Sequence, residues 1–123
     1  MVIVLVKWKI KPDHKDEFLA SWKETYRIKN LDGLIGEFLC SPDSQPYITW
    51  CLPDPGDPPC CIFVNVGLWS DVESFRKQVE PNFNDNKMIE KFEAARRTRA
   101  VLTPAEWRIG KGLLLEANST GVL

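Results

Sequence analysis

Several residue types and patterns that mark common functional sites are scarce or missing in this sequence. It has one histidine, His14, and none of its four cysteines forms a C-x-x-C pair, the short spacing that structural zinc sites normally use. Its 16 basic and 17 acidic residues leave a net charge of -1, so no strong positive field can hold a nucleic acid. It also lacks the G-x-S-x-G, H-E-x-x-H, phosphate-loop and dinucleotide-binding motifs. We therefore expect neither a metal site nor a nucleic-acid partner.

Long apolar runs are missing as well. The first apolar stretch covers only residues 2–6, whereas a membrane-crossing helix needs about 20 apolar residues. No basic segment precedes this stretch, so the pattern of a signal peptide or anchor is absent. We therefore expect no membrane partner and a cytoplasmic location.

The composition is that of one folded domain. The 123 residues are 44% hydrophobic and 27% charged, as in soluble globular proteins, and a chain of this length can bury one core. We expect a single domain over residues 1–115 and a polar C-terminal tail over residues 116–123. Six prolines lie between residues 42 and 60. Because proline cannot sit inside a sheet, this stretch is predicted to be a long loop that serves as a rim or lid.

Apolar residues that alternate with a period of two predict strands at residues 2–11, 34–40 and 61–69, and a last strand at residues 105–113. Apolar residues with helical spacing predict helices over residues 13–28 and 70–80. The capping box of the second helix is formed by Ser70 and Glu73. A third helix is predicted from residue 84 or 85, and it ends in three cations that suit a helix C-terminus, Arg96, Arg97 and Arg99.

The order of these elements predicts an α+β fold of the ferredoxin-like βαββαβ type. That fold is a four-stranded antiparallel sheet with helices on one face. The first and third strands are nevertheless apolar on both faces. An exposed apolar surface of this size is normally covered by another chain. The simplest expectation is a homodimer whose open sheet faces pack against each other.

Three segments carry a resemblance to a known family: "VIVLVKWKIKPDHKDEFLASW", "FVNVGLWSDVESFRKQV" and "LTPAEWRIG". Through them the chain resembles the dimeric α+β barrel superfamily and is most similar to the antibiotic biosynthesis monooxygenase domain family. The resemblance implies a cofactor-independent monooxygenase that uses neither metal nor flavin. It implies a small aromatic or polyketide-type substrate, bound in a pocket between sheet and helices. The family's Asn and Trp on the third strand correspond to Asn65 and Trp69.

Other side chains are candidates for the substrate pocket. They are aromatic residues of the predicted strands and helices together with one arginine: Trp8, Trp22, Tyr26, Phe63, Phe75, Phe92 and Arg96. Aromatic residues at such spacing are also the usual content of a core, and the arginines also fit a solvated helix end. The family arginine corresponds to Arg96 or Arg97. Asn65 is the most informative of all, because an inward amide must be bonded or cost roughly 1–3 kcal/mol.

Two departures from the family keep an alternative open. The family's oxygenases have a tyrosine on the following helix, where this chain has Phe75. No histidine follows Trp69, which argues against the haem-degrading relatives. The alternative is a non-catalytic dimeric module that binds a ligand or acts in stress. An isomerase of the same superfamily is a weaker alternative, because the sequence shows no evident general base.

Overall fold

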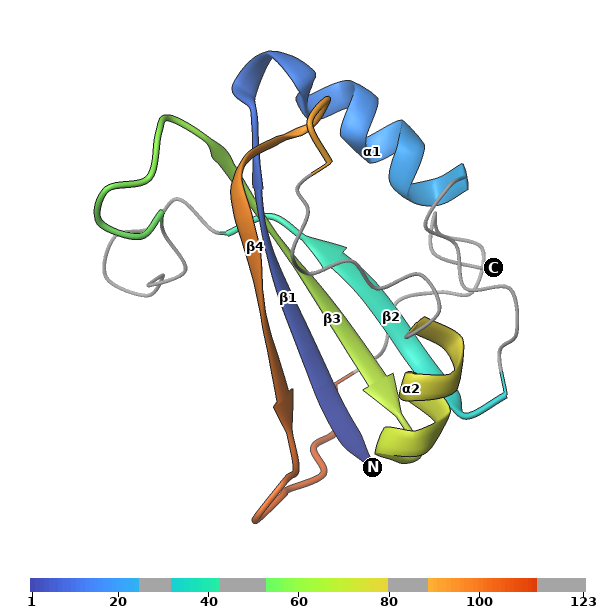
Figure 1. Ribbon diagram of the computed structural model, residues 1–123. Helices are drawn as coiled ribbons and strands as arrows, with labels where there is room; N and C mark the ends of the chain where they lie inside the picture. Colours follow the sequence, from blue (N-terminus) through green and yellow to red (C-terminus); the bar gives the residue numbers. More distant parts are fainter. Residues whose placement is uncertain (25–31, 43–52, 80–88, 113–123) are drawn as a thin grey trace.

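The computed structural model describes residues 1–24, 32–42, 53–79 and 89–112 (Figure 1). Its elements follow the order strand, helix, strand, strand, helix, strand. They are β1 (Val2–Ile10), a 3-10 turn (Pro12–His14), α1 (Lys15–Glu24), β2 (Leu34–Cys40), β3 (Cys61–Trp69), α2 (Val72–Val79) and β4 (Glu93–Leu102). The strands predicted at 34–40 and 61–69 are confirmed, and the first strand ends one residue earlier than predicted.

The strands form one open sheet in the order β2-β3-β1-β4, and every neighbouring pair is antiparallel. The fold is therefore α+β. In the central pair, Trp8 lies opposite Phe63 and Val6 opposite Asn65. Because side chains alternate across a strand, this register places the even-numbered residues of β1 on the same face as the odd-numbered residues of β3.

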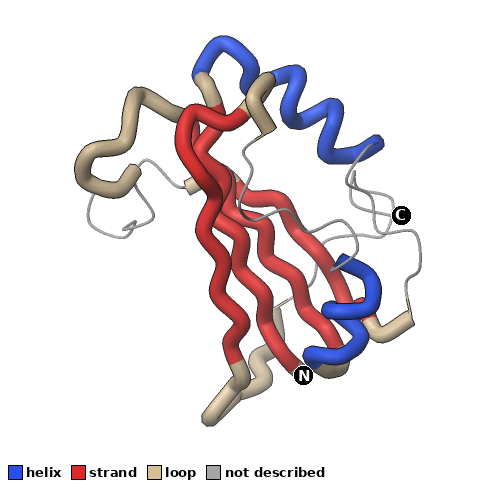
Figure 2. Tube along the Cα trace, in the orientation of Figure 1, coloured by secondary structure: helices blue, strands red, loops and turns tan. Residues whose placement is uncertain are grey.

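Both helices pack on that face of the sheet (Figure 2). The α1 residue Phe18 is fully buried, and its ring lies 5.2 Å from Trp8, 5.5 Å from Phe63 and 6.1 Å from Phe92. The α2 residue Phe75 packs edge-on against Trp69, at 5.6 Å. The core therefore has an aromatic cluster under α1 and a smaller one under α2.

The second helix begins one residue later than its sequence signal indicates. The side chain of Asp71, and not that of Ser70, accepts a hydrogen bond from the backbone N–H of Ser74, at 2.7 Å. An acid in this position satisfies one of the free N–H groups of the first turn and suits the helix dipole. The Ser70 backbone N–H instead donates to the carbonyl of Gly33, at 2.7 Å.

The prediction for the last part of the domain was wrong. Residues 93–102 form β4 and not a helix, and residues 103–112 form no strand. The arginines therefore lie on an edge strand, where charged side chains are well tolerated. Apolar residues at helical spacing misled the prediction, because Ile89 and Phe92 enter the core from a turn that precedes β4.

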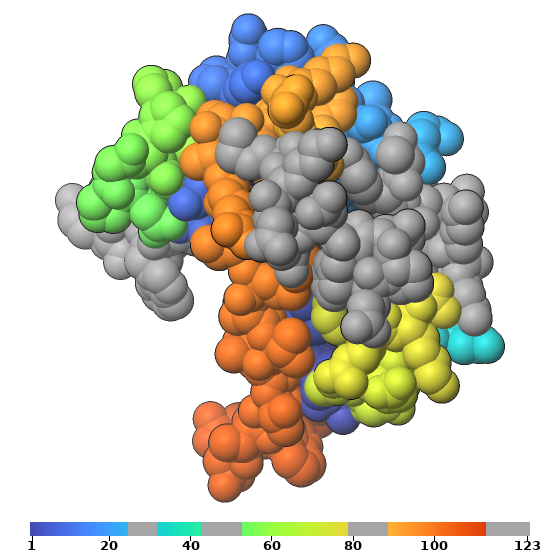
Figure 3. Space-filling view, viewed as in Figure 1, coloured from blue at the N-terminus to red at the C-terminus, as the bar shows by residue number. Residues whose placement is uncertain are grey.

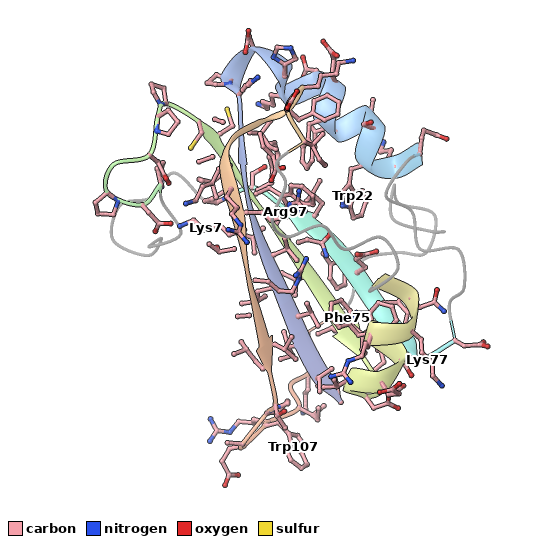
Figure 4. The ribbon with its side chains drawn as sticks, viewed as in Figure 1. Lys7, Trp22, Phe75, Lys77, Arg97 and Trp107 are labelled. Carbon is pink, nitrogen blue, oxygen red and sulfur yellow. The ribbon has the colours of Figure 1, made fainter. Side chains whose placement is uncertain are left out.

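The other face of the sheet carries no described helix, and the described part of the proline-rich loop, residues 53–60, reaches one end of it. Lys9 holds this loop through ion pairs to Asp54, at 2.7 Å, and to Asp57, at 3.0 Å, while Lys7 contacts Asp54 at 3.2 Å. Figure 4 shows Lys7 pointing to this side, away from Trp22 and Phe75. Lys9 is only 5% exposed, so it is not a solvated strand end.

The segment after β4 extends beyond the body of the molecule (Figure 3). Its two large apolar side chains, Trp107 and Ile109, are 76% and 87% exposed. Figure 4 shows Trp107 at the bottom of the view, on the segment that follows β4. Within the described residues, no helix is long and apolar enough to cross a membrane.

Candidate functional site

Asn65 lies at the centre of the helix-facing side of the sheet. It sits in the middle of β3, with Val6 opposite it on β1 and Leu39 opposite it on β2. Its side chain is 8% exposed, and its Nδ2 donates a hydrogen bond to Glu37 Oε1 at 3.0 Å. Its Oδ1 is buried without a hydrogen-bond partner among the described residues. Among the described residues, the site therefore holds a buried acceptor that lacks the hydrogen-bond partner which buried polar atoms normally have.

Glu37 is the carboxyl group of this site, and the sequence analysis did not single it out. It lies on β2 opposite Gly67 and diagonal to Asn65, on the same face. Its side chain is half-buried. Burial raises the pKa of Glu37 above its ordinary value, and the hydrogen bond from Asn65 opposes this only in part. The available signal was an acid within the otherwise apolar run "LIGEFLC".

Trp69 fills the space that Gly67 leaves. A Cβ atom on Gly67 would lie 2.9 Å from Trp69 Nε1, so the indole N–H edge rests on the backbone of the glycine. The indole thus occupies the space that a side chain at position 67 would take. Trp69 is 2% exposed, and the ring of Phe75 on α2 packs edge-on against its indole.

Two arginines of β4 share the helix-facing side, and each has a different setting. Arg97 forms a bidentate ion pair with Glu93, at 2.9 and 3.0 Å, and its guanidinium lies 4.8 Å from the centre of the Trp8 ring. Glu93 also accepts the backbone N–H of Ile89 and is 1% exposed. This pair closes the turn before β4. Arg99 lies opposite Val6 of β1. Asn65 lies on the other side of Val6, on β3, so Arg99 is two strands away from the Asn65 amide.

The remaining predicted pocket residues have different settings in the structure. Trp8, Phe63 and Phe92 surround Phe18 and are at most 8% exposed. Trp22 is partly buried and packs on the core beside them, as Figure 4 shows for its side chain on α1. Arg96 is exposed on β4, whereas Tyr26 lies outside the described residues. The structure thus brings Asn65, Trp69 and Phe75 together with Glu37.

This arrangement combines a carboxyl group, an amide and an indole on one apolar surface. Such a set can accept a proton, donate hydrogen bonds to a developing anion and keep the reacting groups in a low-dielectric setting. Among the described residues, no three His, Cys, Asp or Glu side chains gather in a way that would hold a metal ion.

Comparisons with known proteins add no further assignment. No protein-family model matches the sequence, and a search among curated proteins finds no match for it. The resemblance to the antibiotic biosynthesis monooxygenase domains therefore stays a prediction.

Proposed function

We propose that this protein is a cofactor-independent monooxygenase of the antibiotic biosynthesis monooxygenase type. Its substrate is a small aromatic or polyketide-type molecule, bound between the sheet and the helices. The observation that carries the proposal is the buried amide of Asn65, whose Oδ1 has no partner among the described residues and which lies on the same strand face as Trp69. A polar group costs free energy in such a position unless a partner completes its hydrogen bonds.

The chemistry of this reaction needs few groups from the protein. An anthrone-type substrate has an acidic CH2 group between two rings, and loss of one proton leaves an electron pair delocalised over them. The anion transfers one electron to dioxygen, and the radical pair combines into a peroxide anion. Protonation gives a hydroperoxide, and loss of water gives the carbonyl. In total, CH2 and O2 become C=O and H2O, with dioxygen as the oxidant.

Asn65 and Trp69 have complementary roles in this proposal. The Oδ1 of Asn65 accepts a hydrogen bond from the substrate hydroxyl group, and the indole N–H of Trp69 donates a hydrogen bond that stabilises the anion. Both are neutral, so neither places a charge in the apolar site. The aromatic residues nearby exclude water, which would compete for the anion.

The proposed fold is the ferredoxin-like one, as a dimeric α+β barrel. It is supported by the element order, by the strand order β2-β3-β1-β4 and by the helices on one face. The opposite face carries half-buried apolar side chains on its two central strands: Ile3, Leu5, Val64, Val66 and Leu68. A second copy of the chain that packs there would cover them.

Oxygen uptake with anthrone tests the function. The wild-type protein is expected to accelerate uptake above the spontaneous rate, and Asn65→Ala is expected to lose this acceleration while the protein stays folded. Ser70→Ala, an exposed polar residue at the end of the same strand, serves as the matched control and should behave as wild type. Equal rates for wild type and Asn65→Ala would remove the site assignment.

One observation favours the alternative of a dimeric module that binds a ligand, or acts in stress, without catalysis. The residue that faces Trp69 from α2 is Phe75, which has no hydroxyl group to move protons. Under this alternative, anthrone-like molecules quench the tryptophan fluorescence but are oxidised in air no faster than in the absence of the protein. Conversion to the oxidised carbonyl product faster than the spontaneous rate would exclude it.

A further inference from the structure

The partners of the Glu37 carboxyl group differ from those of an acid with a structural role. Among the described residues, the fully buried acid is Glu93, which has a bidentate arginine and a backbone N–H as partners. Glu37, by contrast, has no cationic partner among the described residues, and its one described hydrogen bond comes from a neutral amide. A half-buried carboxylate without a counter-charge is costly, so its presence calls for a function.

The residue directly opposite Glu37 is Gly67, whose backbone lies under the indole edge of Trp69. Gly67 has no side chain that could stand between the carboxyl group and that edge. On the diagonal, Asn65 fixes Oε1 at 3.0 Å. The second carboxyl oxygen has no partner among the described residues. This hydrogen-bonded pair therefore has two acceptors without a partner among the described residues, namely this oxygen and Asn65 Oδ1.

We propose that Glu37 is the proton acceptor of the site, and this rests on the function proposed above. The substrate C–H bond breaks, its electron pair stays on the substrate as the delocalised anion, and the proton forms an O–H bond on Glu37. After the anion has reacted with dioxygen, the same proton protonates the peroxide. Glu37 thus returns to the carboxylate, and no other reactant is needed. It supplies the base that the sequence analysis did not find.

The electrostatics of the site agree with this role. Desolvation raises the pKa of Glu37, which brings a carboxylate closer to the basicity that proton abstraction near neutral pH requires. The hydrogen bond from Asn65 holds the carboxylate in place and keeps the pKa from rising further.

Deuterium exchange without oxygen tests this role separately from oxygenation. Anthrone is incubated in heavy water under anaerobic conditions, and the loss of its CH2 protons is followed by NMR. We expect catalysed exchange with the wild-type protein and a loss of about 100- to 10,000-fold with Glu37→Gln, the range for removing a general base. Glu37→Asp should retain part of the rate, because it keeps a carboxylate. Glu24→Gln, an exposed acid on α1, is the matched control and should exchange as wild type.

The outcomes separate the two proposals. Exchange by the wild type without oxygen uptake would support Glu37 as the base and contradict the monooxygenase. Unchanged exchange in Glu37→Gln would overturn the role of Glu37 even if oxygen uptake were catalysed. An absence of exchange by the wild type at saturating anthrone would also overturn it. Near-ultraviolet circular dichroism of each variant confirms that it is folded.

Discussion

The indole nitrogen of Trp69 lies 2.9 Å from the position that a Cβ atom on Gly67 would occupy. The Trp69 side chain thus lies over the backbone of Gly67 and fills the space that a side chain at position 67 would need. The contact places a ring N–H edge over the residue that lies opposite Glu37.

Substitution of this glycine should disturb the site directly. Gly67→Ala forces a rigid, buried ring to move, and we expect a loss of about 1–3 kcal/mol of unfolding free energy, the usual cost of overpacking, together with a shift in tryptophan fluorescence. Gly36→Ala is the control on the neighbouring strand, because its Cβ would meet Phe38 at an ordinary 3.6 Å. A Gly67→Ala protein with wild-type stability and emission would contradict the packing described.

Burial raises the pKa of Glu37 above the ordinary 4.5, with the hydrogen bond from Asn65 opposing it. The buried helix residues on this side of the sheet, Phe18 and Phe75, are neutral. Among the described residues of β4, the charged side chains on this face are Glu93, Arg97 and Arg99. The ionised form is therefore the one disfavoured by folding, and stability falls as pH rises from the unfolded pKa through the folded one.

Glu37→Gln removes this dependence because the amide stays neutral. We expect wild type and variant to have similar urea midpoints at pH 4, and the variant to be the more stable at pH 8. Glu24→Gln should show no such divergence. A constant difference between wild type and Glu37→Gln at both pH values would refute the raised pKa.

Lys9 is expected to stabilise the proline-rich loop over a defined pH range. The hydrogen bond to Asp54 is the largest cause that raises the pKa of Lys9 above 10.5, and Lys9 in turn lowers the pKa of Asp54 and of Asp57 below 3.8. The contribution is therefore present at neutral pH. It is lost as pH falls through the lowered aspartate pKa values or rises through that of the lysine.

Lys9→Met should consequently lower the urea midpoint at pH 7, and the difference from wild type should shrink in acid and in strong alkali. Lys23→Met, on the exposed part of α1, is the control and should leave the midpoint unchanged. A difference that persists below the aspartate pKa values would point to lost packing of the lysine stem instead.

The proposed homodimer predicts that a charge on the open sheet face will dissociate it. Val66 lies opposite Leu5 on β1 and Phe38 on β2, so Val66→Lys would bury an unpaired charge between two copies. We expect the dissociation constant to rise about 100-fold or more, as measured by sedimentation velocity. Val72→Lys, a partly exposed residue on α2, is the control. A wild-type monomer at micromolar concentration would contradict the dimer.

Much of the fold could be predicted because its signals are local. The alternation along residues 61–69 and the stripe of α1 each reflect the period of one element, and such a period is written in consecutive residues. The same reasoning failed after residue 88. Apolar residues of a turn and an edge strand happened to match helical spacing there, and only the pairing of β4 with β1 decides between the two.

The candidate site shows the same division. The amide of Asn65 stood out from the sequence, because a polar residue on the inner side of an apolar strand needs an explanation. Glu37 did not stand out, although it lies in the same apolar setting. Its importance comes from a partner 28 positions away along the chain.

The sequence by itself therefore determined three strands, two helices and the inward amide, since each depends on the spacing of neighbouring residues. The tertiary structure alone decided that Glu37 accepts a hydrogen bond from Asn65, that Trp69 lies over Gly67 and that Lys9 is buried with ion pairs to two aspartates of the loop. These contacts depend on strand register and on the conformation of a loop that is distant in sequence. Pairing between distant segments produces no repeating pattern in a single sequence, so the sequence does not predict it.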